Sequence, residues 1–122
     1  MALKMRGIPD DFPAARKPVE REANIEGAVV AWAENNAWEV RKMRYLGRRS
    51  CPDRFFFGYG QIIMVEFKKP GGKLSEGQKL EHTRLRAVGV EVNVFDTVSS
   101  AIAFLKGKMQ YHISSANQGY RE

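Results

Sequence analysis

The sequence has little of what marks secreted or membrane-bound chains. It holds one cysteine, Cys51, so no disulfide can form within the chain, and a reducing compartment is the default expectation. No hydrophobic run approaches the roughly 20 residues that a membrane-spanning helix needs. The first 16 residues lack an apolar stretch followed by small residues, which disfavours a signal peptide. These absences predict a cytoplasmic protein with no membrane partner.

Positive charge is what the chain has in excess. Its 122 residues carry 20 Lys and Arg against 14 Asp and Glu, which gives a net charge of +6 and a pI of about 9.7. Six of the cations fall between Arg41 and Arg54, whereas five glutamates lie before position 40. Clustered positive charge is typical of proteins that bind polyanions, most commonly nucleic acid. An anionic membrane surface is the rival partner, but no strongly amphipathic basic helix is evident.

Hydrophobic spacing predicts an α/β fold in one domain. Apolar residues recur at helical intervals over residues 19–36. A second helix is expected over 75–88, because Ser75 and Gln78 have the spacing of a capping box and Gly89 can end it. Alternation and turn residues predict four strands, at residues 38–46, 54–57, 61–67 and 91–95. A short final helix is expected at residues 97–105.

This order of elements predicts a mixed sheet flanked by helices. The second and third strands can form a hairpin, and residues 61–95 can form a right-handed parallel crossover. We expect an N-terminal arm over residues 1–18, a single domain over 19–106 and a polar, irregular C-terminal tail over 107–122. The aromatic residues Phe55 and Phe57 are expected in the core, and His82 on a helix surface.

Two carboxylates and a lysine form the candidate catalytic group. Side chains alternate along a strand, so Glu66 and Lys68 should project to one side while Phe67 points into the core. If the hairpin forms, Asp53 lies beside Glu66 at its open end. Two carboxylates at one point are costly unless a cation lies between them, and oxygen ligands favour Mg²⁺ or Mn²⁺. Such a metal can polarise a phosphoryl oxygen and activate water.

An isolated Glu-x-Lys at a strand end is usually a solvated ion pair, so the motif needs support. Three features supply it: an apolar strand precedes Glu66, a Pro-Asp pair lies 13 residues upstream across the hairpin, and a basic Gly-Gly loop follows. Taken together, these segments resemble the VRR-NUC domains of the PD-(D/E)xK nuclease superfamily over residues 25–105. The matching segments are GRRSCPDR at 47–54, IMVEFKKPGGKLS at 63–75, Gln78 and residues 85–94.

The resemblance implies a restriction-endonuclease-like fold and a role for each matching residue. Asp53, Glu66 and the backbone carbonyl of Phe67 would hold Mg²⁺ or Mn²⁺, and Lys68 would be the catalytic lysine. The family glutamine corresponds to Gln78, which can also serve only as a capping residue. The family also uses a glutamate of the first helix, for which Glu26 is the best match. Glu22, one turn earlier, is the alternative.

The function that the resemblance implies is hydrolysis of DNA phosphodiester bonds. The expected enzyme is a Mg²⁺- or Mn²⁺-dependent, structure-selective endonuclease, similar to a Holliday-junction resolvase, that acts on branched DNA as a homodimer. The chain departs from the family at Ser50, where glycine is common. The alternative is a non-catalytic DNA-binding accessory module of a replication or repair complex. The expected phosphate contacts are Arg48, Arg49, Arg54, Lys69 and Lys73.

Overall fold

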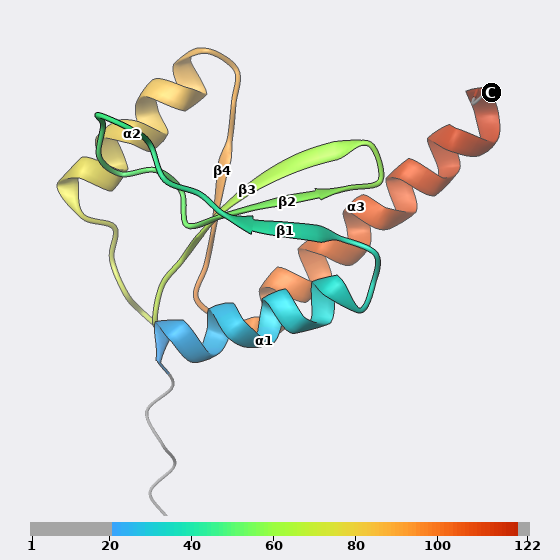
Figure 1. Ribbon diagram of the computed structural model, residues 1–122, viewed down its shortest axis with the longest axis horizontal. Coiled ribbons are helices and arrows are strands. Elements are labelled where there is room, and N and C mark those ends of the chain that lie inside the picture. The colour runs from blue at the N-terminus through green and yellow to red at the C-terminus, as the bar shows by residue number, and fades with distance from the viewer. Residues whose placement is uncertain (1–20, 120–122) are drawn as a thin grey trace, which may run out of the picture.

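The computed structural model describes residues 21–119, and side chains as far as residue 110. Within this part of the chain, three helices and four strands follow one another in the predicted order (Figure 1). Their bounds are α1 Glu22–Glu34, β1 Glu39–Lys42, β2 Arg54–Gly58, β3 Gln61–Phe67, α2 Glu76–Ala87, β4 Val92–Phe95 and α3 Val98–Gly119. The predicted α/β arrangement is therefore confirmed, whereas the expected arm over residues 1–18 lies outside the described residues.

The four strands form one mixed sheet in the order β1-β2-β3-β4. Strands β1, β2 and β3 are antiparallel neighbours, and β4 runs parallel to β3. The β2–β3 hairpin and the β3-α2-β4 crossover are thus both confirmed. Tyr59 and Gly60, which join β2 to β3, have φ of 53° and 73°, as a type I′ hairpin turn requires.

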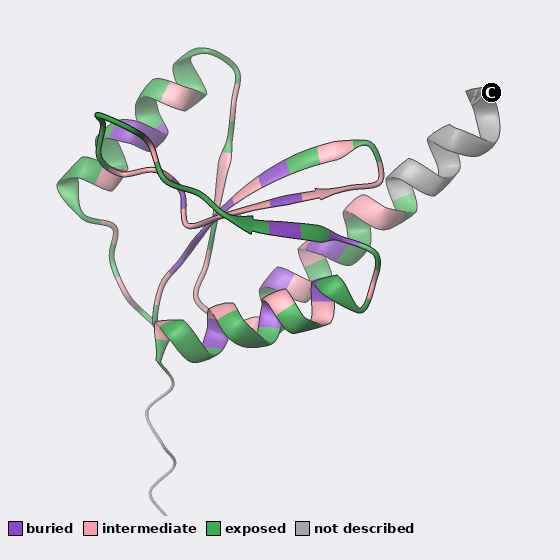
Figure 2. Ribbon diagram, in the orientation of Figure 1, coloured by how far each residue is buried: buried purple, intermediate pink, exposed green. Residues whose placement is uncertain are grey.

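The hydrophobic core lies between the sheet and two helices. Figure 1 shows α1 and α3 along one side of the sheet and α2 on the other. Phe56 of β2 and Val65 and Phe67 of β3 are buried against apolar side chains of α1 and α3, which include Ile25 and Leu105 (Figure 2). Each fully buried side chain of this size contributes about 1.5–3 kcal/mol to folding. The core fixes β3 rigidly and with it the residues at the end of that strand.

Two predicted elements end at different places in the structure. Strand β1 covers only Glu39–Lys42, so residues 43–53 form a long loop before β2. Helix α3 continues to Gly119. The prediction that this helix ends at residue 105, and that an irregular tail follows, is therefore wrong for residues 106–119. The residues after Leu105 are polar but contain no proline, and polarity alone does not end a helix.

The aromatic run of β2 is divided between the two faces of the sheet. Phe56 is fully buried in the core, whereas Phe55 and Phe57 point to the opposite face and are half-buried. The expectation that Phe55 and Phe57 belong to the core is therefore wrong, because strand alternation allows only one face to the core. No helix in the described part of the chain combines the length and apolar character needed to cross a membrane.

Candidate active site

The candidate site lies at the open end of the β2–β3 hairpin. In the hairpin register Arg54 pairs with Val65, so one further step places Asp53 opposite Glu66. The carboxylate of Asp53 accepts a hydrogen bond from the backbone N–H of Phe67 at 2.8 Å. This contact ties the loop before β2 to the end of β3. The proximity of Asp53 and Glu66, which depended on the hairpin being real, is thus present in the structure.

Glu66 is a buried acid, with 1% of its surface exposed. Burial raises the pKa of Glu66, and a hydrogen bond and the negative charge from Asp53 raise it further, to about 9. The positive charge of Lys68 acts in the opposite direction. Near neutral pH and without a cation, Glu66 therefore keeps its proton. A divalent cation bound here would displace the proton, so that Glu66 and Asp53 could both be ionised and bind the cation.

The unpaired atoms of the site fit a bound cation. Glu66 Oε1 is buried and accepts no hydrogen bond from any described residue, although buried carboxylate oxygens are normally paired. Among residues 21–110, no group of three or more His, Cys, Asp and Glu side chains is arranged to hold a metal. The available donors are accordingly two carboxylates and backbone oxygen, a set that suits Mg²⁺ or Mn²⁺ better than a softer metal.

Lys68 stands where the strand alternation predicts it. It follows β3 directly, is half-buried, and lowers the pKa of Glu66 through its charge. Its backbone N–H donates to the carbonyl of Phe95 at 2.9 Å, which continues the pairing with β4 beyond the end of β3. The backbone next to Lys68 is therefore fixed by β4, while its ammonium group acts on the buried acid.

The two candidate helix carboxylates have different surroundings. Glu26 is bonded to the guanidinium of Arg54 at 2.5 Å and lies 3.9 Å from the ammonium of Lys42. Glu22 instead contributes to the raised pKa of Glu66 through its negative charge. Glu26 is thus engaged by Arg54, whereas Glu22 acts on Glu66 through its charge alone, and which of the two serves the site stays a prediction.

Gln78 forms the capping box that its spacing predicts. The backbone N–H of Ser75 donates to Gln78 Oε1 at 2.9 Å, and the backbone N–H of Gln78 donates to Ser75 Oγ at 3.1 Å. Its side-chain oxygen is thereby engaged at the start of α2. A role for Gln78 in the chemistry stays a prediction and would fall to the amide nitrogen.

Two site residues were missed by sequence reasoning, and both lie on α2. Glu81 and His82 are the buried side chains of this helix, so the interpretation of His82 as a surface residue is wrong. His82 Nε2 lies 3.6 Å from Glu66 Oε1, too far for a hydrogen bond, and is likewise unpaired among the described residues. Burial and the charge of Arg86 lower the pKa of His82, so it is neutral. The spacing from Gln78 to His82, one helical turn, could have placed both on one face.

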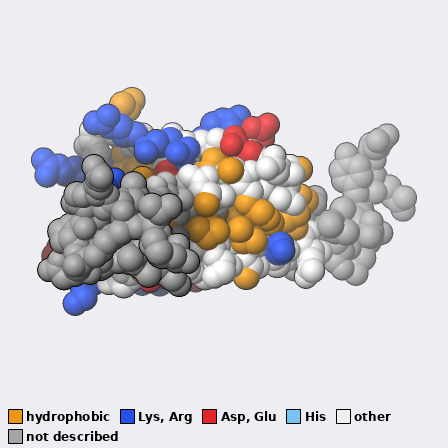
Figure 3. All heavy atoms as spheres, turned by 90° about the horizontal axis from the view of Figure 1, so that it is seen from below, with side chains coloured by type: hydrophobic (Ala, Val, Ile, Leu, Met, Phe, Trp, Pro, Cys, Tyr) orange, Lys and Arg blue, Asp and Glu red, His pale blue; other side chains and the backbone are white. Residues whose placement is uncertain are grey.

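Two of the predicted phosphate contacts, Arg48 and Arg54, form ion pairs with glutamates, although the side chain of Arg48 is 57% exposed. Arg54 is bonded to Glu26, and Arg48 is bonded to Glu81 at 3.0 Å. Arg49, Lys69 and Lys73 are exposed. Figure 3 shows Lys and Arg side chains gathered at one end of the molecule, the end that carries α2 in Figure 1.

The mixed sheet and its flanking helices have the restriction-endonuclease-like arrangement that the sequence predicts for a nuclease. No family model matches the chain. The chain is 40% identical over 78 residues to a protein named "Putative nuclease p44" of Acyrthosiphon pisum secondary endosymbiont phage 1, covering 63% of this chain and 84% of that protein. A solved structure of a "VRR_NUC domain" is 28% identical, with a TM-score of 0.63, over 70% of this chain and 94% of that one. The chain belongs to the VRR-NUC domain nucleases.

Proposed function

We propose that the protein is a deoxyribonuclease that depends on Mg²⁺ or Mn²⁺ and cuts at the Asp53–Glu66 pair. The observation that carries this proposal is the burial of Glu66 next to Asp53, which raises the pKa of Glu66 and leaves its Oε1 unpaired among the described residues. Such a pair is costly to keep unless a cation occupies it during function. Asp53, Glu66 and the backbone carbonyl of Phe67 would hold the metal, which would supply a Lewis acid and an activated water.

The chain's own residues would then divide the work of hydrolysis. Lys68, beside Glu66, would orient or help deprotonate the attacking water and stabilise the negative charge that grows on the phosphate. Glu22 would face the carboxylate pair from α1, since its charge already acts on Glu66. Glu26 would hold Arg54, which in turn would keep the loop before β2 in place. The exposed Arg49, Lys69 and Lys73 would contact phosphates of the bound DNA.

We further propose that the enzyme is a structure-selective endonuclease that acts as a homodimer. A two-fold pair would set two identical sites on two strands of a branched DNA. The final helix, α3, whose backbone continues to Gly119, is our candidate for the contact between the two copies. Light scattering coupled to gel filtration should give twice the mass of the 13.9 kDa chain. A single-chain mass at micromolar concentration would contradict the dimer.

Cleavage of a panel of DNA structures tests the selectivity. Linear, flapped and four-way DNA of equal length would be incubated with the protein in Mg²⁺ and in Mn²⁺. We expect the four-way substrate to be cut fastest and at internal positions. Equal rates on the linear and four-way DNA would contradict structure selectivity, and stepwise shortening from the ends would contradict endonuclease action.

Calorimetry of metal binding separates the enzyme from a non-catalytic DNA-binding module. The basic residues around the site would serve either function, but only the enzyme needs the acidic pair to hold a cation. We expect Mn²⁺ to bind the parent and to bind Asp53→Asn at least tenfold more weakly. The exposed Glu91→Gln variant, which also loses one negative charge, should bind as the parent does. Equal affinity in the parent and Asp53→Asn would favour the DNA-binding module.

A further inference from the structure

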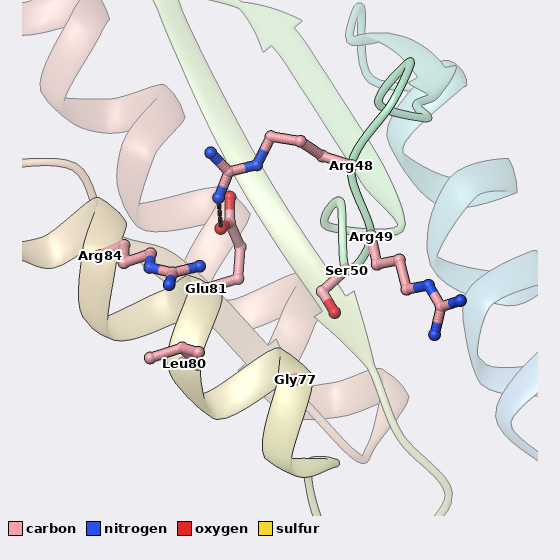
Figure 4. Close-up of a pocket in the computed structure, with 7 residues that line it drawn as sticks. All are labelled: Arg48, Arg49, Ser50, Gly77, Leu80, Glu81 and Arg84. Atoms are coloured by element: carbon pink, nitrogen blue, oxygen red, sulfur yellow. Dashed lines mark hydrogen bonds and ion pairs between the residues drawn. The ribbon is translucent and has the colours of Figure 1, made fainter.

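A cavity lies near the candidate active site, between the loop at residues 47–51 and α2. It has a volume of about 370 Å³, and Figure 4 shows the side chains around it. Its walls approach closely because Gly77 has no side chain: a Cβ at that position would lie 2.9 Å from Ser50 Oγ. The residues that line the cavity are Arg48, Arg49, Ser50, Gly77, Leu80, Glu81 and Arg84.

Arg48 is held in the cavity by a buried acid. Glu81, with 6% of its surface exposed, accepts a hydrogen bond from the hydroxyl of Tyr45 at 2.6 Å and one from Arg48 Nη2 at 3.0 Å. The two bonds reach different carboxylate oxygens, so Glu81 is satisfied and Arg48 is fixed through one nitrogen. The other N–H groups of its guanidinium remain to bind a ligand. A side chain held in place beforehand loses little entropy when the ligand arrives.

The charge of the cavity is positive after Glu81 is counted. Glu81 offsets Arg48, while Arg84 and Arg49 take part in no ion pair with any residue between 21 and 110. Figure 4 shows Arg84 pointing toward the same carboxylate that Arg48 reaches, whereas Arg49 points away from both. Two guanidinium groups that converge from opposite walls form the arrangement that binds a phosphate group through paired hydrogen bonds.

The cavity and the acidic pair share a wall. Two adjacent residues of α2 contribute to the two sites: Glu81 lines the cavity, and His82 lies 3.6 Å from Glu66. Ser50, which lines the cavity, lies three residues before Asp53, which is bonded to the backbone of Phe67. The same short loop therefore contributes to both the cavity and the acidic pair. A nucleic acid strand bound at the acidic pair can extend into the cavity.

We propose that the cavity is a second phosphate site, which binds a phosphodiester of the substrate strand next to the one that is cut. The inference rests on the proposed nuclease function and adds to it a contact that sets the position of the strand along the enzyme. Arg84 and Arg48 hold the phosphate, Glu81 and Tyr45 position Arg48, and Leu80 at the rim, half exposed, contacts the adjoining sugar or base.

The test is the salt dependence of DNA binding, measured without cleavage. Fluorescence anisotropy in EDTA would give Kd for labelled DNA at several salt concentrations, for the parent, Arg84→Gln and Lys106→Gln. Both variants lose one positive charge at an exposed position, but Lys106 lies on α3, across the sheet from α2. We expect Arg84→Gln to lower the slope of log Kd against log salt by about 0.7–0.9, because one phosphate contact is lost. Lys106→Gln should leave this slope unchanged.

A variant that keeps the net charge tests whether Arg84→Gln acts only through long-range electrostatic attraction of the DNA. Leu80→Trp keeps an apolar residue at a half-exposed position and places a larger side chain at the rim of the cavity. We expect Leu80→Trp to weaken DNA binding and to lower the salt slope in the same way as Arg84→Gln. Both variants should keep the unfolding transition of the parent, because neither position is buried.

The outcomes separate this inference from the function on which it rests. Identical slopes for Arg84→Gln and Lys106→Gln would overturn the phosphate site but leave the nuclease proposal intact. A parent that binds no DNA would overturn both. Titration with a nucleoside monophosphate covers the other source of phosphate. Saturable binding of the nucleotide that Arg84→Gln abolishes, with no change in DNA binding, would show a free-nucleotide site and overturn the strand contact.

Discussion

At the scale of single residues, the protonation of Glu66 links stability to pH. The carboxyl keeps its proton up to a pKa of about 9 in the folded protein, against 4.5 as its ordinary value. Between these values the folded state holds a proton that the unfolded state has lost, so stability falls as pH rises. In EDTA, urea unfolding of the parent should therefore show decreasing stability from about pH 5 to about pH 9.

The matched variant for this prediction is Glu66→Gln, which cannot ionise and keeps the shape of the side chain. Its unfolding free energy should lose this downward slope over the same range of pH. Parallel pH profiles of the two proteins would show that Glu66 ionises normally and that its pKa is not raised in the folded protein.

The backbone conformation of Ser50 is one that glycine adopts more easily, which agrees with the glycine that the family resemblance leads us to expect there. Its φ is +68°, in the left-handed region that glycine adopts without steric cost. The departure at Ser50 thus keeps the conformation of the loop and strains the residue. Replacement by glycine removes that strain but adds freedom to the unfolded chain. We expect Ser50→Gly to raise the unfolding free energy by up to about 1 kcal/mol in urea titrations. A loss of more than about 1 kcal/mol would mean that the Ser50 hydroxyl stabilises the loop.

At the scale of elements, α2 begins at a complete capping box. Ser75 and Gln78 each accept a hydrogen bond from the other's backbone N–H. Ser75→Ala removes one of these bonds and should cost about 1 kcal/mol in unfolding free energy, by chemical denaturation. Ser99→Ala, at an exposed serine in the first turn of α3, is the control and should cost less than half as much. Equal losses would mean that the box does not hold the start of α2.

Local signals in the sequence predicted the elements that they control directly. The bounds of β3 are those that the alternation indicated, and Ser75 caps α2 as its spacing with Gln78 required. The end of α3 was missed, because the chain after Leu105 becomes polar without a proline. The buried positions of α2 were also missed. They are Glu81 and His82, and hydrophobic periodicity cannot detect a helix that buries ionisable side chains.

At the scale of the whole molecule, the site is made by contacts between segments far apart in the chain. Strand alternation placed Glu66 and Lys68 together, but the position of Asp53 required the hairpin, and that of His82 required the crossover to close over β3. Glu22 and Glu26 differ in their surroundings because of how α1 lies against the sheet, which no local pattern encodes. The sequence therefore predicted which residues come together at the centre of the candidate site, and packing determines what surrounds them.

The central claim is that Glu66 holds the metal with which the enzyme cuts DNA. The most direct measurement is the single-turnover cleavage rate of a four-way DNA in Mg²⁺, for the parent and for Glu66→Gln. The variant keeps the size of the buried side chain, and gel filtration and its unfolding transition verify that it folds. We predict that the parent cuts only when the metal is present, and that Glu66→Gln is slower by at least about 100-fold. A variant that cuts as fast as the parent would contradict the account.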